Sequence, residues 1–172
     1  FAERTGPDFM NLQRNKRSLT LNCKDADGLA IFRKLADRAD VVAENFRPDV
    51  KFRLGIDYAT LKTTNPRLVY ASISGFGQDG PYAKRAGFDQ IAQGMGGFMS
   101  ITGEAGRGPM RAGIAIADSA AGLYCALGVM TALLEREASG EGQWVQVSLL
   151  QAMIAMLDFQ AARWLVSKEV PP

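Results

Sequence analysis

Two patterns of apolar and polar residues alternate along this chain, one typical of strands and one typical of helices. Short apolar runs rich in β-branched residues predict strands, whereas longer stretches with apolar residues three or four apart predict amphipathic helices. Strands are expected at residues 17–23, 40–46, 67–74 and 143–150. Helices are expected at residues 28–39, 50–56, 57–64, 88–102, 116–140 and 149–166. Because strands and helices alternate, we expect one α/β domain over residues 1–172, with a Rossmann-like, open and mainly parallel sheet flanked by helices.

Several of these elements carry their own start and stop signals. Asp25 or Asp27 is expected to cap the helix at 28–39, and Asp57 the helix at 57–64, because a carboxylate accepts hydrogen bonds from free N–H groups at a helix start. Gly55 is a candidate C-cap. The stretch 116–140 predicts the longest helix and is interpreted as buried, since Asp118 interrupts an apolar run that would otherwise suggest a membrane span. Its expected apolar stripe consists of Ala120, Leu123, Leu127, Met130, Leu133 and Leu134.

Glycines follow the third predicted strand in the pattern G-x-G-x-x-G, at Gly75, Gly77 and Gly80. A dinucleotide-binding turn needs a helix that starts at the third glycine and an acidic residue about 20 positions further on. Here Gly87 follows too soon for a full helix, and Glu104 lies in a polar loop. We therefore expect a shaped turn that needs glycine backbone angles, and a nicotinamide-dependent oxidoreductase remains a minor alternative.

Composition excludes several kinds of chemistry. The 172-residue chain contains no histidine, so it cannot supply a Ser-His-Asp triad, a Cys-His pair or a histidine-ligated zinc. Its net charge of +2 gives no case for nucleic acid or a membrane surface as partner. Cys23 and Cys125 have no metal-ligand spacing and are expected to be reduced thiols in a cytoplasmic protein. Any catalysis must therefore use carboxylates, lysine, tyrosine, serine, cysteine or backbone donors.

Asp118 is the carboxylate with the most interesting surroundings. It lies in the apolar stretch AIADSAAG at the first turn of the longest predicted helix, where an aspartate most often acts as a cap. The functional alternative is a carboxylate held ionised in an apolar cleft, which can attack an activated acyl group. Asp89 in GFDQIAQ is a second candidate, again with capping as its alternative. Small basic groups that could converge on phosphates lie beside predicted strand ends or helix starts, at residues 14–17, 24, 47–53 and 84–85.

The order of the motifs resembles class III CoA-transferases, the CaiB/BaiF-type family of formyl-CoA transferase and crotonobetainyl-CoA:carnitine CoA-transferase. The resemblance is carried by four segments that together cover nearly the whole chain: 15–28 (NKRSLTLNCKDADG), 39–82, 87–104 and 116–150. It implies that Asp118 matches the family's catalytic aspartate, which attacks an acyl-CoA thioester, forms a mixed anhydride and releases CoA thiolate. Phe88 stands where the related α-methylacyl-CoA racemases have a histidine, which favours transferase over racemase.

The resemblance also implies a set of CoA contacts. They fall on the end of the first predicted strand, on the ENF motif, on a basic-apolar pair and on the segment that leads into the fourth predicted helix, where Arg85 stands beside a position, Ala86, that is lysine in formyl-CoA transferase. The implied CoA-binding residues are Leu21, Asn22, Cys23, Lys24, Asn45, Phe46, Arg47, Arg53, Leu54, Arg85, Ala86, Gly87, Phe88 and Asp89. CoA enters as a substrate, together with an acyl group and a carboxylic acid, and no metal is implied.

Full family members are more than twice as long, and the chain resembles the central part of their large domain without the small domain and the glycine-rich lid. We therefore expect a truncated α/β core, a homo-oligomer by family resemblance, with little transferase activity on its own. The alternative is a catalytically inactive CoA-binding or structural module that self-associates. The acyl donor and acceptor are not specified by the sequence.

Overall fold

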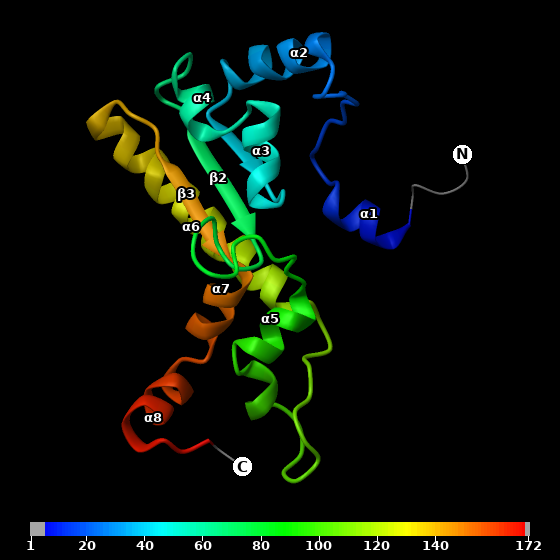
Figure 1. The fold of residues 1–172 in the computed structure, drawn as a ribbon, viewed down its shortest axis with the longest axis vertical. Coiled ribbons are helices and arrows are strands. Elements are labelled where there is room, and N and C mark those ends of the chain that lie inside the picture. Colours follow the sequence, from blue (N-terminus) through cyan, green and yellow to red (C-terminus); the bar gives the residue numbers. More distant parts are fainter. Residues whose placement is uncertain (1–5, 171–172) are drawn as a thin grey trace.

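The structure is a computed structural model that describes residues 6–170, and it shows a parallel sheet flanked by helices (Figure 1). The strands are β1 (Val41–Glu44), β2 (Val69–Ser74) and β3 (Trp144–Ser148). They pair in the order β1-β2-β3, and both pairings are parallel. The helices are α1 (Pro7–Leu12), α2 (Ala26–Ala36), α3 (Pro48–Leu54), α4 (Tyr58–Lys62), α5 (Asp89–Met95), α6 (Ile116–Ser139), α7 (Leu149–Met156) and α8 (Phe159–Ser167), with a short 3₁₀ helix, η1 (Phe98–Ile101). The predicted fold class is confirmed.

Local signals placed most of these elements correctly. The Asp25 side chain accepts hydrogen bonds from the N–H groups of Asp27 and Gly28 at the start of α2. Asp57 does the same for Thr60 in α4. Gly55 ends α3 in the left-handed conformation, with φ of 62°. These caps form within a few residues of each other in sequence, which is why the sequence alone predicts them.

The two faces of the sheet carry two separate core clusters. Val42, Tyr70 and Trp144 are in register across the three strands and pack with buried side chains of α2 and α4. Ile73 and Val147 lie on the other face and pack against a cluster of mostly small residues from α5, α6 and α7. The sheet is therefore covered on both faces, as parallel sheets usually are.

The predicted apolar stripe of α6 is wrong in part. Ala120 is buried, but Leu123, Leu127, Met130 and Leu134 are exposed, and the buried face is instead formed by Ala117, Ala120, Ala121, Cys125, Ala132 and Arg136. A Cβ atom added at Gly128 would lie 2.7 Å from Cγ1 of Val145, so the helix backbone approaches β3 very closely. Only small side chains fit this approach, and the leucines consequently face outward. By length and composition α6 could also span a membrane, and only 28% of its most apolar 18-residue window is buried, so the interpretation of this stretch as a buried helix is wrong in part.

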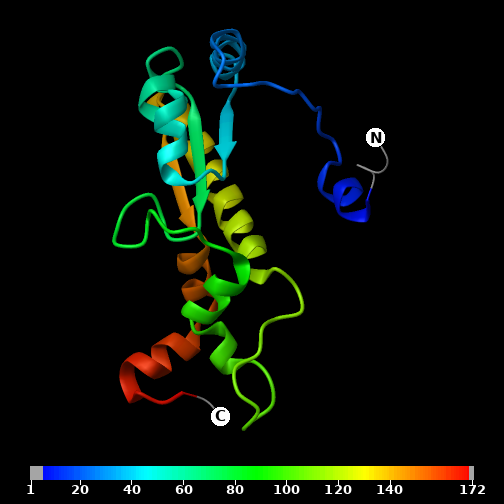
Figure 2. The same cartoon turned by 45° about the vertical axis from the view of Figure 1, so that its right-hand side comes forward.

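Two further predictions about secondary structure are wrong. Residues 17–23 form no strand: they are extended without ladder pairing and run away from the sheet toward α1 (Figure 2). A β-branched pattern becomes a strand only where a partner strand supplies hydrogen bonds. The single helix expected at 149–166 is broken at Asp158, which has φ of 50°, and α8 is turned by 80° relative to α7.

The glycines after β2 have structural reasons that differ from one to the next. Gly77 and Gly80 have φ of 100° and 87°, values that strongly favour glycine. Gly75 touches Gly87, and a Cβ atom on Gly75 would lie 2.3 Å from the Cα atom of Gly87. Residues 75–87 therefore form a loop, hereafter the glycine loop, that is closed at its base by two glycines. No helix starts at Gly80, since α5 begins only at Asp89, so the dinucleotide-binding geometry is not formed here.

Substitution of Gly75 by alanine is expected to lower the free energy of unfolding by about 1–3 kcal/mol, the usual range for overpacking. The added methyl group meets backbone, which cannot rotate away as a side chain could. Chemical denaturation of both proteins measures the difference. Gly113→Ala is the matched control, because nothing lies within 4 Å of a Cβ atom at Gly113. Equal stability of the Gly75 and Gly113 variants would contradict the close approach.

Candidate functional site

A pocket lies along the edge strand β1, at the carboxyl end of the sheet. Its volume is about 410 Å³. It is enclosed by the segment before α2 and one residue of α2, by β1 and the two residues after it, by the end of α3 and Ile56, and by Tyr70 near the start of β2. The lining residues are Leu21, Asn22, Cys23, Lys24, Phe32, Val42, Ala43, Glu44, Asn45, Phe46, Leu54, Ile56 and Tyr70. The carboxyl end of a parallel sheet is the usual place for a ligand in open α/β folds.

The residues that the sequence proposed for CoA divide into two groups in space. One group lines this pocket although its members come from three separate segments: Leu21, Asn22, Cys23, Lys24, Asn45, Phe46 and Leu54. Arg47 and Arg53 do not line it. Arg53 lies on α3 and Arg47 at its N-cap position; both are exposed, and they approach the carboxylate of Asp49 at 3.3 and 3.9 Å. Because Phe46 and Leu54 are their neighbours in sequence, the two arginines stand close outside the pocket.

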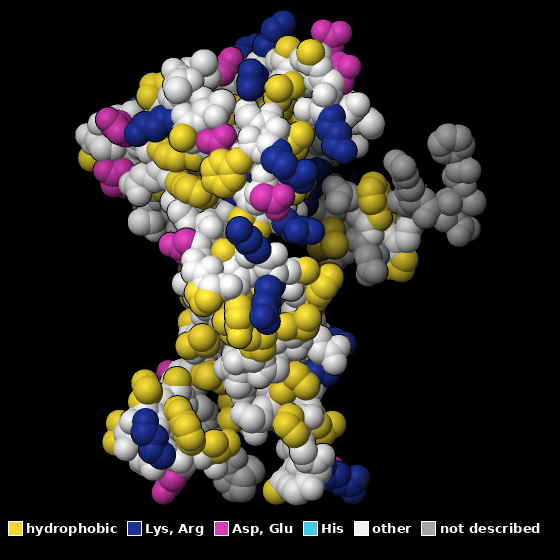
Figure 3. All heavy atoms as spheres, viewed as in Figure 1, with side chains coloured by type: hydrophobic (Ala, Val, Ile, Leu, Met, Phe, Trp, Pro, Cys, Tyr) yellow, Lys and Arg dark blue, Asp and Glu magenta, His cyan; other side chains and the backbone are white. Residues whose placement is uncertain are grey.

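Basic side chains gather on the same part of the molecule. In the space-filling view, Lys and Arg side chains lie over α3 and the glycine loop in the upper half (Figure 3). Their pairing with Asp49 is exposed to water, where an ion pair contributes about 0–1 kcal/mol. Such a weak pairing leaves Arg47 and Arg53 free to exchange Asp49 for phosphate oxygens of a ligand.

Glu44, which lines the pocket, forms a buried ion pair with Lys51 of α3. The Lys51 Nζ atom lies 3.3 Å from Glu44 Oε1, and the two side chains are 0% and 4% exposed. Glu44 also accepts hydrogen bonds from the Phe46 N–H, at 2.7 Å, and from the Ser72 hydroxyl. Lys51 in turn donates to the side-chain oxygen of Gln78 in the glycine loop. The pair thus ties β1, α3 and the glycine loop together.

Tyr70 lies at the floor of the pocket and is completely buried. Its ring packs against those of Tyr58 and Trp144. Its hydroxyl has no hydrogen-bond partner among residues 6–170, and burial, followed by the charges of Glu44 and Asp57, raises the pKa of this phenol above its usual value. A ligand or water molecule in the pocket would give the neutral hydroxyl the partner that it lacks.

The second group of proposed CoA residues lies at the other end of the glycine loop. The guanidinium of Arg85 stacks on the ring of Tyr82, 4.1 Å from its centroid. Ala86 and Phe88 are exposed, and Gly87 closes the loop against Gly75. The structure therefore places residues 85–89 apart from the pocket lining but connected to it through the glycine loop.

Asp118 lies in the first turn of α6, and the prediction that it caps this helix is wrong. The N-cap position is Ala115, and no side chain of α6 itself caps the helix. Instead, Oδ1 of Asp89 accepts hydrogen bonds from the N–H groups of Ala117 and Asp118, at 2.8 and 3.3 Å. Partial burial, followed by the charge of Asp89, raises the pKa of the Asp118 carboxyl. The Asp118 carboxylate thus does not cap α6. It lies near the carboxylate of Asp89, close to the end of the glycine loop.

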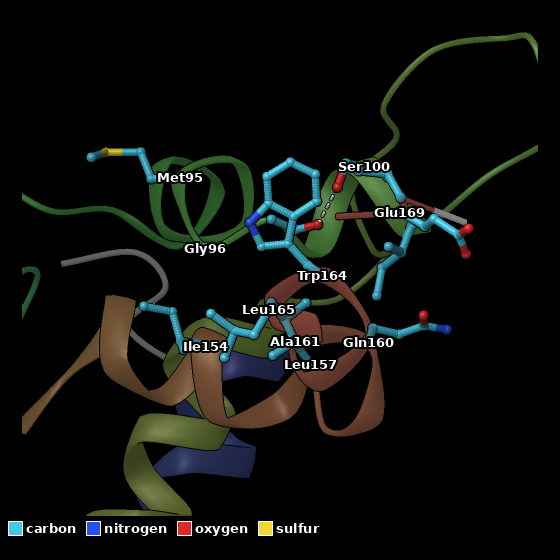
Figure 4. Close-up of a pocket in the computed structure, with 13 residues that line it drawn as sticks. Met95, Gly96, Ser100, Ile154, Leu157, Gln160, Ala161, Trp164, Leu165 and Glu169 are labelled. Carbon is cyan, nitrogen blue, oxygen red and sulfur yellow. Dashed lines mark hydrogen bonds between the residues drawn. The ribbon is translucent and has the colours of Figure 1, made fainter. Parts of the chain in front are cut away.

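A larger hollow lies elsewhere, between α5 and η1 on one side and α7 and α8 on the other (Figure 4). It measures about 530 Å³ and is walled mainly by apolar side chains, including Ile154, Leu157 and Trp164. Within it, the Ser100 hydroxyl is already engaged by the Gly97 carbonyl at 2.6 Å. Glu169 is its one ionisable lining residue in the described chain, so the hollow offers less chemistry than the pocket beside β1.

Some residues of the site were missed by the sequence analysis. Gln93 binds Asp89, and their spacing of four residues on one helix was a usable signal. Lys51 and Glu44 carried no such signal, because they lie on different elements and meet only in the folded chain. Residues 6–170 contain no cluster of His, Cys, Asp or Glu side chains suited to a metal ion.

The chain is similar in sequence to a family of known proteins. A family model described as CoA-transferase family III matches residues 1–172. The chain is 47% identical over 158 residues to a succinate–glutarate CoA-transferase of Agrobacterium fabrum, covering 92% of the chain and 40% of that protein. It is 41% identical over 164 residues to an acetyl-CoA:oxalate CoA-transferase of Acetobacter aceti, covering 95% and 42%.

A solved structure shows the same arrangement. A CAIB/BAIF family protein from Brucella suis superimposes with a TM-score of 0.88 at 44% identity, covering 91% of this chain and 41% of that one. The chain thus spans about 40% of the length of the relatives that it matches.

Proposed function

The chain belongs to CoA-transferase family III, and on this premise we propose that the protein transfers CoA from an acyl-CoA thioester to a carboxylic acid, with Asp118 as nucleophile. The observation that carries the proposal is that seven residues proposed for CoA from three separate segments line one pocket. The members of the family named above act, by their names, on small carboxylic acids and their CoA thioesters.

The nucleotide end of CoA is proposed to occupy the pocket beside β1. Lys24 at its rim, with Arg47 and Arg53 outside it, would bind phosphate oxygens through charge-assisted hydrogen bonds. Apolar and aromatic side chains such as Phe32 and Phe46 offer surfaces for the adenine ring. The remainder of CoA would follow the glycine loop, past Arg85 and Phe88, toward Asp118.

At the acyl end, the Asp118 carboxylate is proposed to attack the thioester carbonyl carbon. A C–O bond forms, the C–S bond breaks, and CoA leaves as the thiolate, so that the acyl group is held as an aspartyl anhydride. The acceptor acid and CoA then exchange through anhydride and thioester intermediates. A carboxylate whose pKa is raised is the more basic nucleophile, and desolvation together with the charge of Asp89 raises the pKa of the Asp118 carboxyl.

A second candidate is a CoA-binding module without activity. It is favoured by the exposure of Asp118 in the described chain. Water that reaches an aspartyl anhydride would hydrolyse it instead of allowing transfer. The two candidates share the CoA pocket and differ in whether an acyl group reaches Asp118.

Calorimetric titration of CoA into the 172-residue chain tests the shared part. The wild type is expected to bind CoA, and Arg53→Ala is expected to bind about tenfold more weakly, since a hydrogen bond to a charged group contributes about 1.5 kcal/mol. Asp118→Ala is expected to bind as the wild type does, because Asp118 acts on the acyl end.

Arg107→Ala is the matched control, since Arg107 is also exposed and also paired with an acidic neighbour, Glu104, but lies far from the pocket in the sequence and does not line it. Absence of binding by the wild type would overturn the proposed CoA site. An equal loss in the Arg53 and Arg107 variants would reduce the binding to unspecific attraction by positive charge.

A further inference from the structure

Asp89 was named above as a second candidate carboxylate, with capping as its alternative, and as part of the segment along CoA; the contacts of its side chain point to a further task. We infer that Asp89, held in place by Gln93, is a positioning residue for Asp118: it occupies the free N–H groups at the start of α6 and so leaves the Asp118 carboxylate unbonded for attack on an acyl-CoA. This inference rests on the proposed function.

The first step is that Asp89 caps a helix other than its own. It is the first residue of α5, yet α5 has no side-chain cap, and the Asp89 carboxylate turns to α6 instead. Oδ1 accepts from the N–H groups of Ala117 and Asp118, at 2.8 and 3.3 Å. These donors lie 28 and 29 residues further along the chain, so the contact exists only in the folded protein.

The second step is that the cap is anchored. Gln93, one turn along α5, is completely buried. Its Nε2 atom donates to Oδ2 of Asp89 at 2.6 Å and to the Ile114 carbonyl at 3.4 Å, and its Oε1 atom accepts from the Ala112 N–H at 2.9 Å. The pair therefore fixes the lead-in to α6 at Ala112 and Ile114 as well as at the helix start, and both acceptor and donor capacities of the Gln93 amide are used.

The Asp89 cap determines which contacts remain for the Asp118 carboxylate. An aspartate in the first turn of a helix is normally drawn to the free N–H groups and the positive end of the helix dipole, which stabilise its anion. With Asp89 already bound to two of these groups, the Asp118 carboxylate accepts no hydrogen bond from residues 6–170 and forms no salt bridge with them. The neighbouring negative charge further disfavours its anionic form. Both effects leave a more reactive carboxylate.

Three variants of the 172-residue chain separate positioning from general stability. Asp89→Asn keeps an oxygen that can accept from Ala117 but removes the charge, Asp89→Ala removes both, and Asp57→Ala removes the side-chain cap of α4 as a matched loss of a cap elsewhere. Three quantities are measured: amide hydrogen exchange at Ala117 and Asp118, the pKa of the Asp118 carboxyl by NMR titration, and the rate at which succinyl-CoA with hydroxylamine converts Asp118 to its hydroxamate.

Asp89→Ala is expected to speed amide exchange at Ala117 and Asp118 at least about tenfold, since one hydrogen bond to a charged group is lost, and to slow hydroxamate formation. Asp89→Asn is expected to keep the amides protected while the pKa of Asp118 falls. Asp57→Ala is expected to change none of the three. Unchanged exchange and hydroxamate rate in Asp89→Ala would overturn the positioning role, as would equal effects of Asp57→Ala.

The proposed function fails separately, and in a different measurement. If the wild-type chain binds no CoA by calorimetry, the CoA site is refuted whatever the Asp89 variants do. If it binds CoA and the amide and pKa changes at Asp118 are absent in the Asp89 variants, the CoA site stands and the positioning role is refuted.

Discussion

Substitution of Asp118 by asparagine is expected to abolish the covalent acyl intermediate. In the wild-type chain, succinyl-CoA in the presence of hydroxylamine should convert Asp118 to a hydroxamate, because hydroxylamine traps an aspartyl anhydride before water does. Asparagine has nearly the same shape but lacks the anionic oxygen that attacks the thioester. Intact-mass and peptide-mass measurements detect the adduct and its position. Removal of an essential nucleophile typically lowers kcat by several orders of magnitude, so we expect the adduct to fall below detection.

Glu137→Gln is the control for this experiment, since Glu137 is an exposed carboxylate at the far end of α6, in contact with Arg67 and Arg136. The control should form the Asp118 adduct at the wild-type rate. A hydroxamate on another residue, or one that persists in Asp118→Asn, would contradict the proposed nucleophile. CoA binding without any adduct in the wild type would favour the module without activity.

Asp118→Asn is expected to remove the acyl adduct but to raise the thermal stability of the chain at pH 7. The folded chain raises the pKa of Asp118 above its ordinary value. The group therefore contributes most to stability when it is protonated, below the pKa of the unfolded chain, and this contribution is lost as the pH rises through the folded pKa. We expect Asp118→Asn to have a higher Tm than the wild type at pH 7 and a similar Tm near pH 3.5. A lower Tm of the variant at pH 7 would contradict the raised pKa.

Replacement of Lys51 by methionine is expected to be strongly destabilising, with a loss of about 3–5 kcal/mol in the free energy of unfolding. It leaves Glu44 buried without its counter-ion, and the 4% exposure of that side chain leaves little room for water to compensate. Because Glu44 also holds the Phe46 N–H, we expect CoA binding to weaken as well. Urea denaturation and calorimetry measure the two effects.

Lys62→Met is the matched control, since the Lys62–Glu141 pair lies at the surface, with side chains 39% and 67% exposed. Its loss should cost no more than about 1 kcal/mol. The double variant Lys51→Met/Glu44→Gln should recover part of the stability, because the uncompensated charge is gone. Similar losses for Lys51→Met and Lys62→Met would show that the buried pair has no special role.

Much of the site was visible in the sequence because the family motifs are contiguous. The resemblance to the family implied CoA contacts at segments 21–24 and 45–46, and the folded chain brings these segments to one pocket. Arg47 and Arg53, for which the same resemblance implied CoA contacts, do not line the pocket. Asp89 was recognised as a candidate, yet its partner could not be, since a hydrogen bond across 28 residues leaves no local pattern.

The sequence by itself determined the order of strands and helices and most of their ends. Caps such as Asp25 and Asp57 accept hydrogen bonds from N–H groups two or three residues away. Hydrophobic periodicity is likewise a property of a single element, so both can be predicted from a short stretch of sequence. Tertiary structure decided what required distant partners. Residues 17–23 form no strand because no ladder pairs with them, and α6 buries alanines because β3 approaches its backbone too closely for leucine. Among residues 6–170, the carboxylate that accepts hydrogen bonds from N–H groups at the start of α6 is that of Asp89 on α5, and not that of Asp118, whose own position predicted it.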